Sequence, residues 1–210
     1  MYLHRIHLDL RRTEARRDVA DPYEMHSTLC RAFSTPEAKC APGAFLWRLE
    51  PELSSDGMPK VIVQSREIPE WSRINLPEWF GEKPSPSLDL ARKLAFHDIK
   101  NGSRFRYRVR ANPSVRRNGK RIGLFDATTQ IAWFQRQGKK NGFKPLTIHR
   151  SEERMLTGKI RSGHPIRVFS VLYDGILEVT DTQLFNKVVS DGIGHAKAMG
   201  LGLLSVIPMK

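Results

Sequence analysis

Residues 21–33 carry the segment that decides the fold, Asp21-Pro-Tyr-Glu-Met-His-Ser-Thr-Leu-Cys-Arg-Ala-Phe33. Asp21 is a good N-cap, Pro22 suits the first helical position, and Glu24 completes a pattern similar to a capping box. The helix is expected to end before Pro36, because proline disfavours helical backbone in the residue before it. It follows residues 1–10, whose side chains alternate as in a half-buried strand. The chain therefore begins with a strand and a helix.

The same reading predicts two successive sets of elements. The first set continues with strands at 44–49 and 60–65, joined by a turn at 54–57, then an irregular stretch at 69–87 with one helical turn and a strand at 88–97. The second set has strands at 104–112, 144–154, 166–179 and 201–208, with helices at 127–140 and 180–190. Two β-α-β-β-α-β orders predict an α+β fold of tandem ferredoxin-like (RRM-like) domains, residues 1–98 and 103–210.

The net charge is strongly positive and unevenly distributed. The 210 residues carry a formal charge of +13, and residues 100–167 hold 18 Lys and Arg against the acids Asp126, Glu152 and Glu153. A concentrated positive field points to a polyanion, RNA or DNA more often than an acidic protein. No basic amphipathic helix of the membrane-surface type is evident.

The sequence excludes several other classes. No apolar run approaches the ~18 residues of a membrane span, and the first residues lack a secretory pattern, so we expect a cytoplasmic protein without a membrane partner. The two cysteines, Cys30 and Cys40, cannot build a disulfide framework and lack zinc-knuckle spacing, which favours reduced thiols. No motif for a cofactor is present, and no pair of histidines has metal-ligand spacing on one helix.

The first helix presents a candidate catalytic pair. On a helical wheel Met25 and Leu29 belong to the core stripe, whereas Tyr23 and His26 lie one turn apart on its flank, with Arg31 further round. An imidazole can act as acid or base near neutral pH, and a phenol can donate a hydrogen bond. With RNA such a pair suffices for cleavage, because the ribose 2′-OH can attack its own phosphate. The alternative is that His26 is an ordinary histidine on a helix flank.

Basic residues form three groups in the second half of the chain. Arginines alternate along residues 104–110, which places their side chains on one strand face as a row that tracks a nucleic-acid backbone, unless acids of the sheet pair with them. An Asn-Gly turn at 118–119 carries cations at its tip, and residues 149–161 have the charge of a basic hairpin that enters a duplex groove. The expected contacts are Arg104, Arg106, Arg108, Arg110, Arg116, Arg117, Lys120, Arg121, Arg150, Arg154, Lys159 and Arg161.

The tail is rich in glycine at Gly192, Gly194, Gly200 and Gly202. Glycines so placed predict a loop whose backbone lies close to a partner, since they lack a Cβ atom. Exposed amides beside Lys197 make the loop a candidate phosphate cradle. It does not match a dinucleotide fingerprint.

Several of these segments together resemble the CasE family, the CRISPR RNA-processing endoribonucleases of Cascade-type systems. The resemblance covers the whole chain and lies in the opening Met-Tyr-Leu, Tyr23-Glu-Met-His26 with Leu29 and Phe33, Tyr107-Arg-Val-Arg-Ala-Asn-Pro113, Gln130-Ile-Ala-Trp-Phe-Gln135, and the tail Gly192-Ile-Gly-His-Ala-Lys-Ala-Met-Gly-Leu-Gly-Leu-Leu-Ser205. Tandem ferredoxin-like domains are what membership implies, in agreement with the element order.

The resemblance also implies an activity. It implies metal-independent cleavage of precursor CRISPR RNA at the base of each repeat hairpin, a 2′,3′-cyclic phosphate end, retention of the product, and assembly with other Cascade subunits. His26 would then act as general acid or base, Tyr23 would position the phosphate or the 2′-OH, and Arg31 would offset transition-state charge. The rival hypotheses are a non-catalytic module that binds hairpin RNA and a structural ribosome-associated protein.

Overall fold

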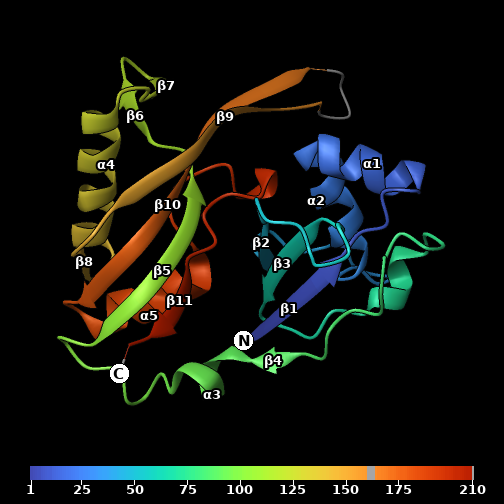
Figure 1. Cartoon of the computed structure of the whole chain (residues 1–210), viewed down its shortest axis with the longest axis horizontal. Helices are drawn as coiled ribbons and strands as arrows, with labels where there is room; N and C mark the ends of the chain where they lie inside the picture. The colour runs from blue at the N-terminus through green and yellow to red at the C-terminus, as the bar shows by residue number, and fades with distance from the viewer. Residues whose placement is uncertain (160–163, 210) are drawn as a thin grey trace. The chain divides into compact units, whose positions relative to one another are not determined.

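The computed structural model describes residues 1–159 and 164–209, drawn in Figure 1. The chain divides into two compact units. Unit 1 comprises Met1–Lys93, Leu156–Arg167 and Ala198–Gly200, and unit 2 comprises Leu94–Met155, Val168–Lys197 and Leu201–Lys210. The first boundary falls a few residues before the linker expected at 98–103. Two segments from the second half of the chain belong to unit 1, which the order of elements alone did not indicate.

Unit 1 is built on a four-stranded antiparallel sheet with strand order β2-β3-β1-β4. Its elements are β1 Tyr2–His7, α1 Thr13–Ala20, α2 Pro22–Arg31, β2 Phe45–Leu49, β3 Lys60–Ser65, a 3-10 turn η1 Trp71–Ile74, β4 Leu88–Asp89 and α3 Leu90–Leu94, whose last residue begins unit 2. The strands at 44–49 and 60–65 and the helical turn in 69–87 are thus confirmed.

Helices α1 and α2 pack on the same face of this sheet. Buried side chains of α1 and α2, such as Ala15 and Leu29, belong to one hydrophobic cluster with Ile6 of β1, Trp47 of β2 and Val63 of β3. Burying apolar side chains of this size stabilises the fold by roughly 1.5–3 kcal/mol each. The cluster holds α2 by its apolar stripe, and the flank that carries Tyr23 and His26 lies at the edge of this cluster.

Unit 2 is built on a second antiparallel sheet with strand order β11-β5-β10-β8, and β9 pairs with β10. Its elements are β5 Arg104–Ala111, β6 Ser114–Arg117, β7 Lys120–Gly123, α4 Ala127–Lys140, β8 Phe143–Pro145, β9 His149–Lys159, β10 Pro165–Val179, α5 Thr182–Asp191, the first residue of a 3-10 turn η2 Lys197–Met199, and β11 Ser205–Pro208. The strands β9 and β10 begin in one unit and end in the other.

The core of unit 2 is largely aromatic. Phe134 of α4 stacks on Tyr107 of β5, with 5.2 Å between ring centroids, and on Tyr173 of β10, with 4.8 Å. Phe185 of α5 packs on Phe105 at 5.3 Å. Phe105 and Tyr107 alternate with arginines along β5, so the predicted alternation of this strand is confirmed.

Two predictions of secondary structure were wrong, and one helix was missed. Helix α1 was not predicted, and its N-cap residue Arg12 makes no side-chain capping bond. The strand expected at 88–97 is a two-residue edge strand followed by α3, and the strand expected at 144–154 is divided into β8 and β9. None of the helices in residues 1–159 and 164–209 has the length and apolar character that crossing a bilayer requires.

Candidate active site

Helix α2 begins at a capping carboxylate. The side chain of Asp21 accepts hydrogen bonds from the backbone amides of Tyr23, at 2.8 Å, and Glu24, at 3.4 Å, which satisfies amides that have no partner within the helix. The same carboxylate accepts a hydrogen bond from the amide of Lys159 at 3.2 Å. The N-cap prediction is confirmed, and the end of β9 lies beside the first turn of α2.

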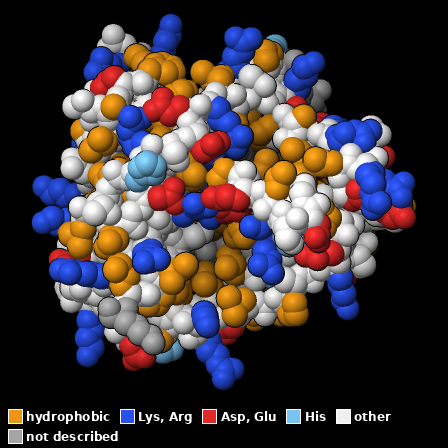
Figure 2. All heavy atoms as spheres, viewed as in Figure 1, with side chains coloured by type: hydrophobic (Ala, Val, Ile, Leu, Met, Phe, Trp, Pro, Cys, Tyr) orange, Lys and Arg blue, Asp and Glu red, His pale blue; other side chains and the backbone are white. Residues whose placement is uncertain are grey.

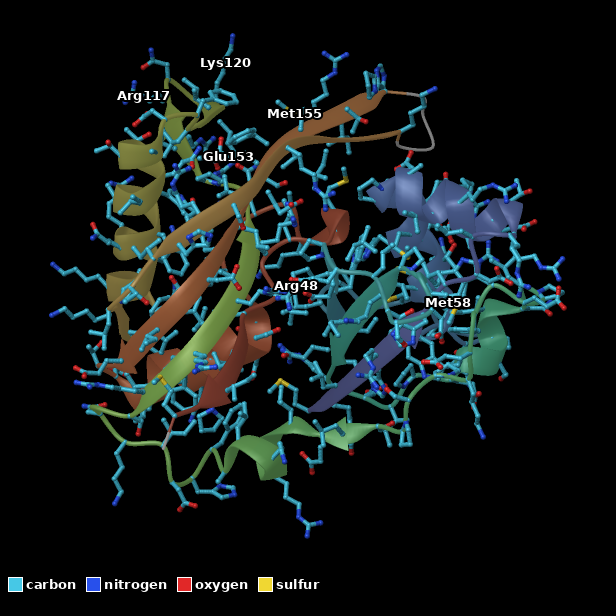
Figure 3. All side chains as sticks on the ribbon, in the orientation of Figure 1. Arg48, Met58, Arg117, Lys120, Glu153 and Met155 are labelled. Atoms are coloured by element: carbon cyan, nitrogen blue, oxygen red, sulfur yellow. The ribbon has the colours of Figure 1, made fainter. Side chains whose placement is uncertain are left out.

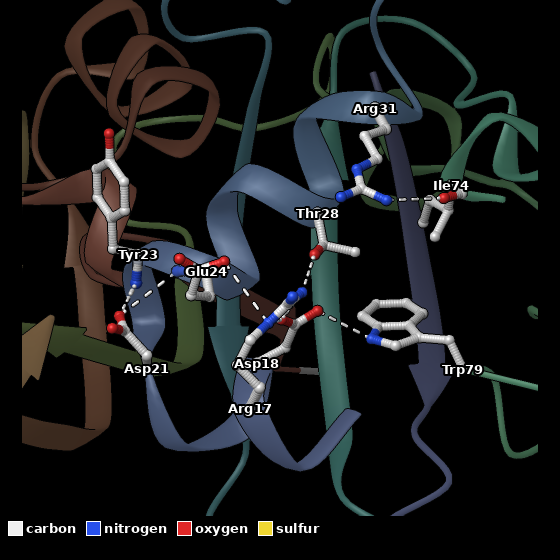
Figure 4. A network of polar contacts seen from close by, with 9 residues as sticks. All are labelled: Arg17, Asp18, Asp21, Tyr23, Glu24, Thr28, Arg31, Ile74 and Trp79. Atoms are coloured by element: carbon white, nitrogen blue, oxygen red, sulfur yellow. Dashed lines mark hydrogen bonds and ion pairs between the residues drawn. The ribbon is translucent and has the colours of Figure 1, made fainter. Parts of the chain in front are cut away.

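A buried polar network holds α2 from its other side, as Figure 4 shows. Asp18 of α1 is 1 % exposed and accepts hydrogen bonds from the Arg17 guanidinium, at 2.7 Å, and from the indole N–H of Trp79, at 2.9 Å. Arg17 also donates to the Thr28 hydroxyl at 3.4 Å and lies 3.6 Å from the Glu24 carboxylate. Since a buried carboxylate without partners would be costly, these bonds fix α2 against α1.

The flank of α2 lines a cleft of about 550 Å³. Its walls combine a phenol, an imidazole, two thiols and two cations, from Tyr23, His26, Ser27, Cys30, Arg31, Ser34, Lys39 and Cys40. The structure therefore brings all three candidate catalytic residues to one surface. Lys39, from the loop between α2 and β2, is a second cation that sequence reasoning missed, because only the path of that loop places it here.

His26 is half-buried at the wall of this cleft. Its ring packs on Phe45, with 5.1 Å between centroids, and its Nε2 atom lies 3.7 Å from Sγ of Cys30. Nδ1 is buried and has no hydrogen-bond partner among the described residues. Burial lowers the pKa of His26 below its ordinary value. At neutral pH the imidazole is therefore uncharged, the state in which it can accept a proton.

Tyr23 and Arg31 occupy the two ends of the same helix flank. In Figure 4 the Tyr23 phenol points away from the capping carboxylate of Asp21, and the tyrosine is half-buried. The Arg31 guanidinium is exposed and donates one hydrogen bond to the Ile74 carbonyl at 3.2 Å. An arginine side chain has five N–H donors, so this single bond leaves donors for a bound anion.

The arginine row of β5 differs from the expectation of a free cationic face. Arg104 pairs with Glu178 at 3.0 Å and Arg108 with Asp174 at 2.7 Å, both across the ladder to β10. Arg110 is 2 % exposed and donates to the Glu152 carbonyl at 2.9 Å. For these three arginines the alternative given by the sequence, pairing with acids of the sheet, is the correct one. Because Arg110 is buried, it does not belong to a surface that contacts RNA. Arg106 is exposed and has no ion pair in the described part of the chain.

The hairpin of β6 and β7 matches the prediction of a cationic arm. Asn118 and Gly119 both have positive φ, 47° and 75°, as a two-residue turn of this type requires. Figure 3 shows Arg117 and Lys120 at the tip of this hairpin. All four cations of the arm are exposed, namely Arg116, Arg117, Lys120 and Arg121.

The expected basic hairpin is present as β9 and β10, and Gly158 lies inside β9. A Cβ atom on Gly158 would lie 2.8 Å from Oδ1 of Asp21 and 3.2 Å from Cβ of Tyr23. Of the expected contacts, Lys159 is exposed, Arg154 is half-buried, Arg150 pairs with Glu153, and Arg161 lies outside the described residues. The strand thus passes directly over the first turn of α2.

The glycine tail serves packing within the protein. All four glycines have positive φ, between 74° and 89°. A Cβ atom on Gly200 would lie 2.9 Å from the ring of Trp47, and one on Gly202 would lie 2.5 Å from the Ile193 carbonyl oxygen. The amide of Gly202 donates to the Arg110 carbonyl at 2.7 Å. This amide is therefore unavailable to a phosphate, which corrects the cradle interpretation at that position.

Cations nevertheless gather beside the first half of this tail. Partial burial, and then the charges of Arg121, Lys197 and Lys140, lower the pKa of the exposed His195. The ammonium of Lys197 donates to the Asp191 carbonyl at 2.5 Å. Lys140 is a further member of this cluster, not indicated by the sequence. On the face shown in Figure 2, Lys and Arg side chains project at many points, with acids among them.

The described residues contain no group of three His, Cys, Asp or Glu side chains that could hold a metal ion. Cys30 and Cys40 are both free thiols. The chemistry available in the cleft is accordingly that of an imidazole, a phenol, thiols and two cations.

Comparison with known proteins agrees with the resemblance seen in the sequence. Residues 1–208 match the family model described as CRISPR associated protein. The chain is 35 % identical over 224 residues to the CRISPR-associated endoribonuclease Cse3 of Thermus thermophilus, covering 99 % of this chain and 100 % of that one. It is 28 % identical to the Cascade subunit CasE of Escherichia coli, covering 90 % and 93 %.

A solved structure extends this likeness to the fold. Thermus thermophilus Cse3 bound to an RNA that represents a pre-cleavage complex superimposes with a TM-score of 0.82 at 33 % identity, covering 99 % of this chain and 98 % of that one. The similarity therefore spans both units and all the elements that carry the cleft.

Proposed function

This chain belongs to the family of CRISPR-associated proteins, and on that premise we propose that it is a metal-independent endoribonuclease that cleaves precursor CRISPR RNA at the base of the repeat hairpin. The observation that carries the proposal is the cleft shared by Tyr23, His26, Arg31 and Lys39. The names of two relatives, an endoribonuclease and a Cascade subunit, support the same activity.

The reaction follows from what these side chains can do. The 2′-OH of the nucleotide before the cut attacks the adjacent phosphorus, the P–O5′ bond breaks, and the products carry a 2′,3′-cyclic phosphate and a 5′-OH. Uncharged His26 accepts the 2′-OH proton, and the imidazolium so formed can return a proton to the leaving oxygen. No bound water takes part, because the nucleophile belongs to the RNA.

The other residues of the cleft position the RNA and stabilise the transition state. The Tyr23 hydroxyl holds the phosphate or the 2′-OH in position. Arg31 and Lys39 offset the negative charge that grows on the phosphate oxygens, and removal of one such donor typically slows a reaction by about 10²–10³-fold. Lys39 takes this role in the proposal on geometry alone, since it lies in the same cleft as His26.

We further propose that each unit is a ferredoxin-like domain. The first sheet has the order β2-β3-β1-β4, with its first and third strands central. The second has the order β11-β5-β10-β8, which is the same arrangement once β9, the extra partner of β10, is left aside. The α1–α2 pair follows the first strand of unit 1, and α4 follows the first long strand of unit 2. This arrangement supports the tandem fold expected from the order of elements.

The remaining cations hold the RNA. The exposed arm Arg116, Arg117, Lys120 and Arg121, with Arg106 and Lys159, contacts phosphates of the hairpin. The protein keeps its cleaved product and joins the other subunits of a Cascade complex, in the cytoplasm where the transcript is made. The name of the Escherichia coli relative supports this assembly.

The test is cleavage of the repeat hairpin RNA from the same genome, in EDTA, under single-turnover conditions. We expect wild-type protein to cut at one position, His26→Ala to abolish cutting with little loss of affinity, and a 2′-deoxy nucleotide at the cut site to block it. His97→Ala is the matched control, because His97 is exposed and lies outside the cleft. Native cutting by His26→Ala would overturn the role of His26, and binding without any cutting by wild-type protein would leave a non-catalytic module that binds hairpin RNA.

A further inference from the structure

The two cysteines of the chain both line the cleft of His26. Cys30 lies on α2, and Cys40 lies in the loop that leads to β2. Both are half-buried free thiols, so small molecules that enter the cleft can reach them. The proposed cleavage reaction uses neither thiol.

A single hydroxyl ties the backbones of the two cysteines together. Ser34 donates its hydroxyl hydrogen to the Cys30 carbonyl at 2.8 Å, and its oxygen accepts a hydrogen bond from the Cys40 amide at 3.2 Å. One hydroxyl oxygen therefore holds both backbone segments, which keeps the two cysteines near each other, as a disulfide requires. The loop is also closed on itself by mutual hydrogen bonds between Thr35 and Ala38.

The side chains meet as well as the backbones. Each thiol shifts the pKa of the other, so the two side chains lie close together. Both side chains line the same cleft, so they face a common space.

We propose that Cys30 and Cys40 form a dithiol site that a small-molecule disulfide oxidises to an intramolecular disulfide, and that this modification slows RNA cleavage in the same cleft. The second half of this statement rests on the proposed nuclease function. The first half is independent of it.

The chemistry is two successive thiol–disulfide exchanges. The Cys40 thiolate attacks one sulfur of the small disulfide, a mixed disulfide forms, and one small thiolate leaves. The Cys30 thiolate then attacks the Cys40 sulfur, the protein S–S bond forms, and the second small thiolate leaves. Two electrons pass from the protein to the small disulfide, and the two protons lost by the cysteines go to the departing thiolates.

Burial sets the pace of this reaction. It raises the pKa of Cys30 to about 12 and also raises that of Cys40, so thiolate is scarce at neutral pH. Oxidation is therefore expected to be slow at pH 7 and faster at alkaline pH.

The disulfide alters the surroundings of the proposed base. Sγ of Cys30 lies 3.7 Å from Nε2 of His26, and bond formation replaces its S–H by a sulfur without a proton. It also anchors the loop residue next to Lys39, whose ammonium lines the cleft. We expect the single-turnover cleavage rate to fall at least tenfold on oxidation and to recover with dithiothreitol.

The experiment treats the full chain with oxidised glutathione at pH 8.5 and removes the reagent before any assay. Intact mass then reports a loss of two hydrogens per chain, and peptide mapping reports the Cys30–Cys40 pair. Phenylarsine oxide is a second probe, because one arsenic bridges two thiols with release of water only where both lie within reach. The Cys40→Ser variant is assayed with and without oxidant, and each rate is compared with its own untreated sample.

The outcomes separate the two proposals. Intramolecular disulfide, bridged arsenic and a slowed rate in wild type, with no effect of oxidant on Cys40→Ser, support both halves. Persistent free thiols, disulfide-linked dimers or unbridged arsenic overturn the dithiol site, whatever the activity. A disulfide with an unchanged rate overturns the regulation alone, and reduced protein that never cuts RNA overturns the proposed function while the mass data still decide the disulfide.

Discussion

The Asp21 carboxylate accepts a hydrogen bond from the Lys159 amide at 3.2 Å, although 138 residues separate them. The same side chain caps α2 through the Tyr23 amide. One carboxylate thus sets both the start of the helix that bears His26 and the position of the strand end beside it. Loss of this group is expected to disturb the geometry of the cleft as well as the helix.

Replacement of Asp21 by alanine should therefore affect stability and cleavage together. The lost N-cap lowers the free energy of unfolding by about 1 kcal/mol, and the released strand end slows single-turnover cleavage. Asp126→Ala is the matched control, since Asp126 caps α4 through the Thr129 amide at 2.8 Å and lies in unit 2. Urea unfolding and cleavage rates measure both effects. Equal slowing by the two variants would show that helix capping in general, and not Asp21, matters to the site.

The rate of cleavage should depend on pH through His26. Burial lowers the pKa of its imidazole below 6.5, and a general base works only when uncharged. The rate at subsaturating RNA, which reports the free protein, is therefore expected to be flat from pH 8 to pH 6.5 and to fall at lower pH. An inflection above pH 6.5 in the pH profile of the wild-type protein would contradict this assignment of the base.

The cationic arm should govern the salt dependence of RNA affinity. Each phosphate contact contributes about one unit to the slope of log K against log salt, so Arg117→Gln with Lys120→Gln should lower that slope by roughly 1–2. Lys187→Gln is the control, because Lys187 is exposed but pairs with Asp191 on α5. Filter binding at salt concentrations between about 50 and 300 mM measures this slope for each variant. A slope that the double variant leaves unchanged would remove the arm from the RNA interface.

Gly200 should tolerate alanine less well than Gly194. Both residues have φ of 74°, so each substitution incurs about 1 kcal/mol of backbone strain. At Gly200 the new Cβ also meets the Trp47 ring at 2.9 Å, whereas at Gly194 its nearest neighbour is the Trp133 ring at 3.5 Å. Overpacking adds roughly 1–3 kcal/mol at Gly200 only. Thermal unfolding of the two variants compares them, and equal losses would rule out the close approach to Trp47.

Local signals in the sequence predicted the elements that carry the cleft. Asp21 caps α2 as expected, and Asp126 and Asp181 cap α4 and α5 in the same way, because capping depends only on neighbouring residues. Helix α1 lacks such a signal. Its stabilisation comes from Asp18, which contacts Trp79 from a distant part of the chain, and a tertiary contact of this kind leaves no periodic pattern.

In the candidate site, too, local patterns predicted some residues, and tertiary contacts that the sequence does not reveal placed the others. The helical wheel placed Tyr23 and His26 on one flank, and they line one cleft. Lys39 and Cys40 reach that cleft through a loop whose path depends on the Ser34 hydroxyl, which spacing cannot predict. The pairing of Arg108 with Asp174 depends on the register of two strands far apart in sequence, so the alternation along β5 predicted the face but not its partners.

His4 provides a last prediction, on acid stability. It is 1 % exposed, its ring meets Trp71 edge-on with 5.5 Å between centroids, and neither ring nitrogen has a hydrogen-bond partner among residues that the structure describes. Burial lowers its pKa from 6.5 to about 4, because a charged imidazole is poorly solvated there. The unfolded chain therefore takes up the proton first as the pH falls.

The stability that His4 contributes as an uncharged residue is present in full above pH 6.5 and is lost as the pH falls from 6.5 towards 4. One pKa unit corresponds to 1.36 kcal/mol, so the loss reaches about 3 kcal/mol over this window. His4→Phe keeps an aromatic ring against Trp71 without a titrating group, and it should lose that much less stability on acidification. Urea midpoints at pH 7 and pH 4 measure the difference, with His97→Phe as the exposed control. If wild type and His4→Phe lose stability in parallel, His4 accepts a proton in the folded protein as readily as in the unfolded chain.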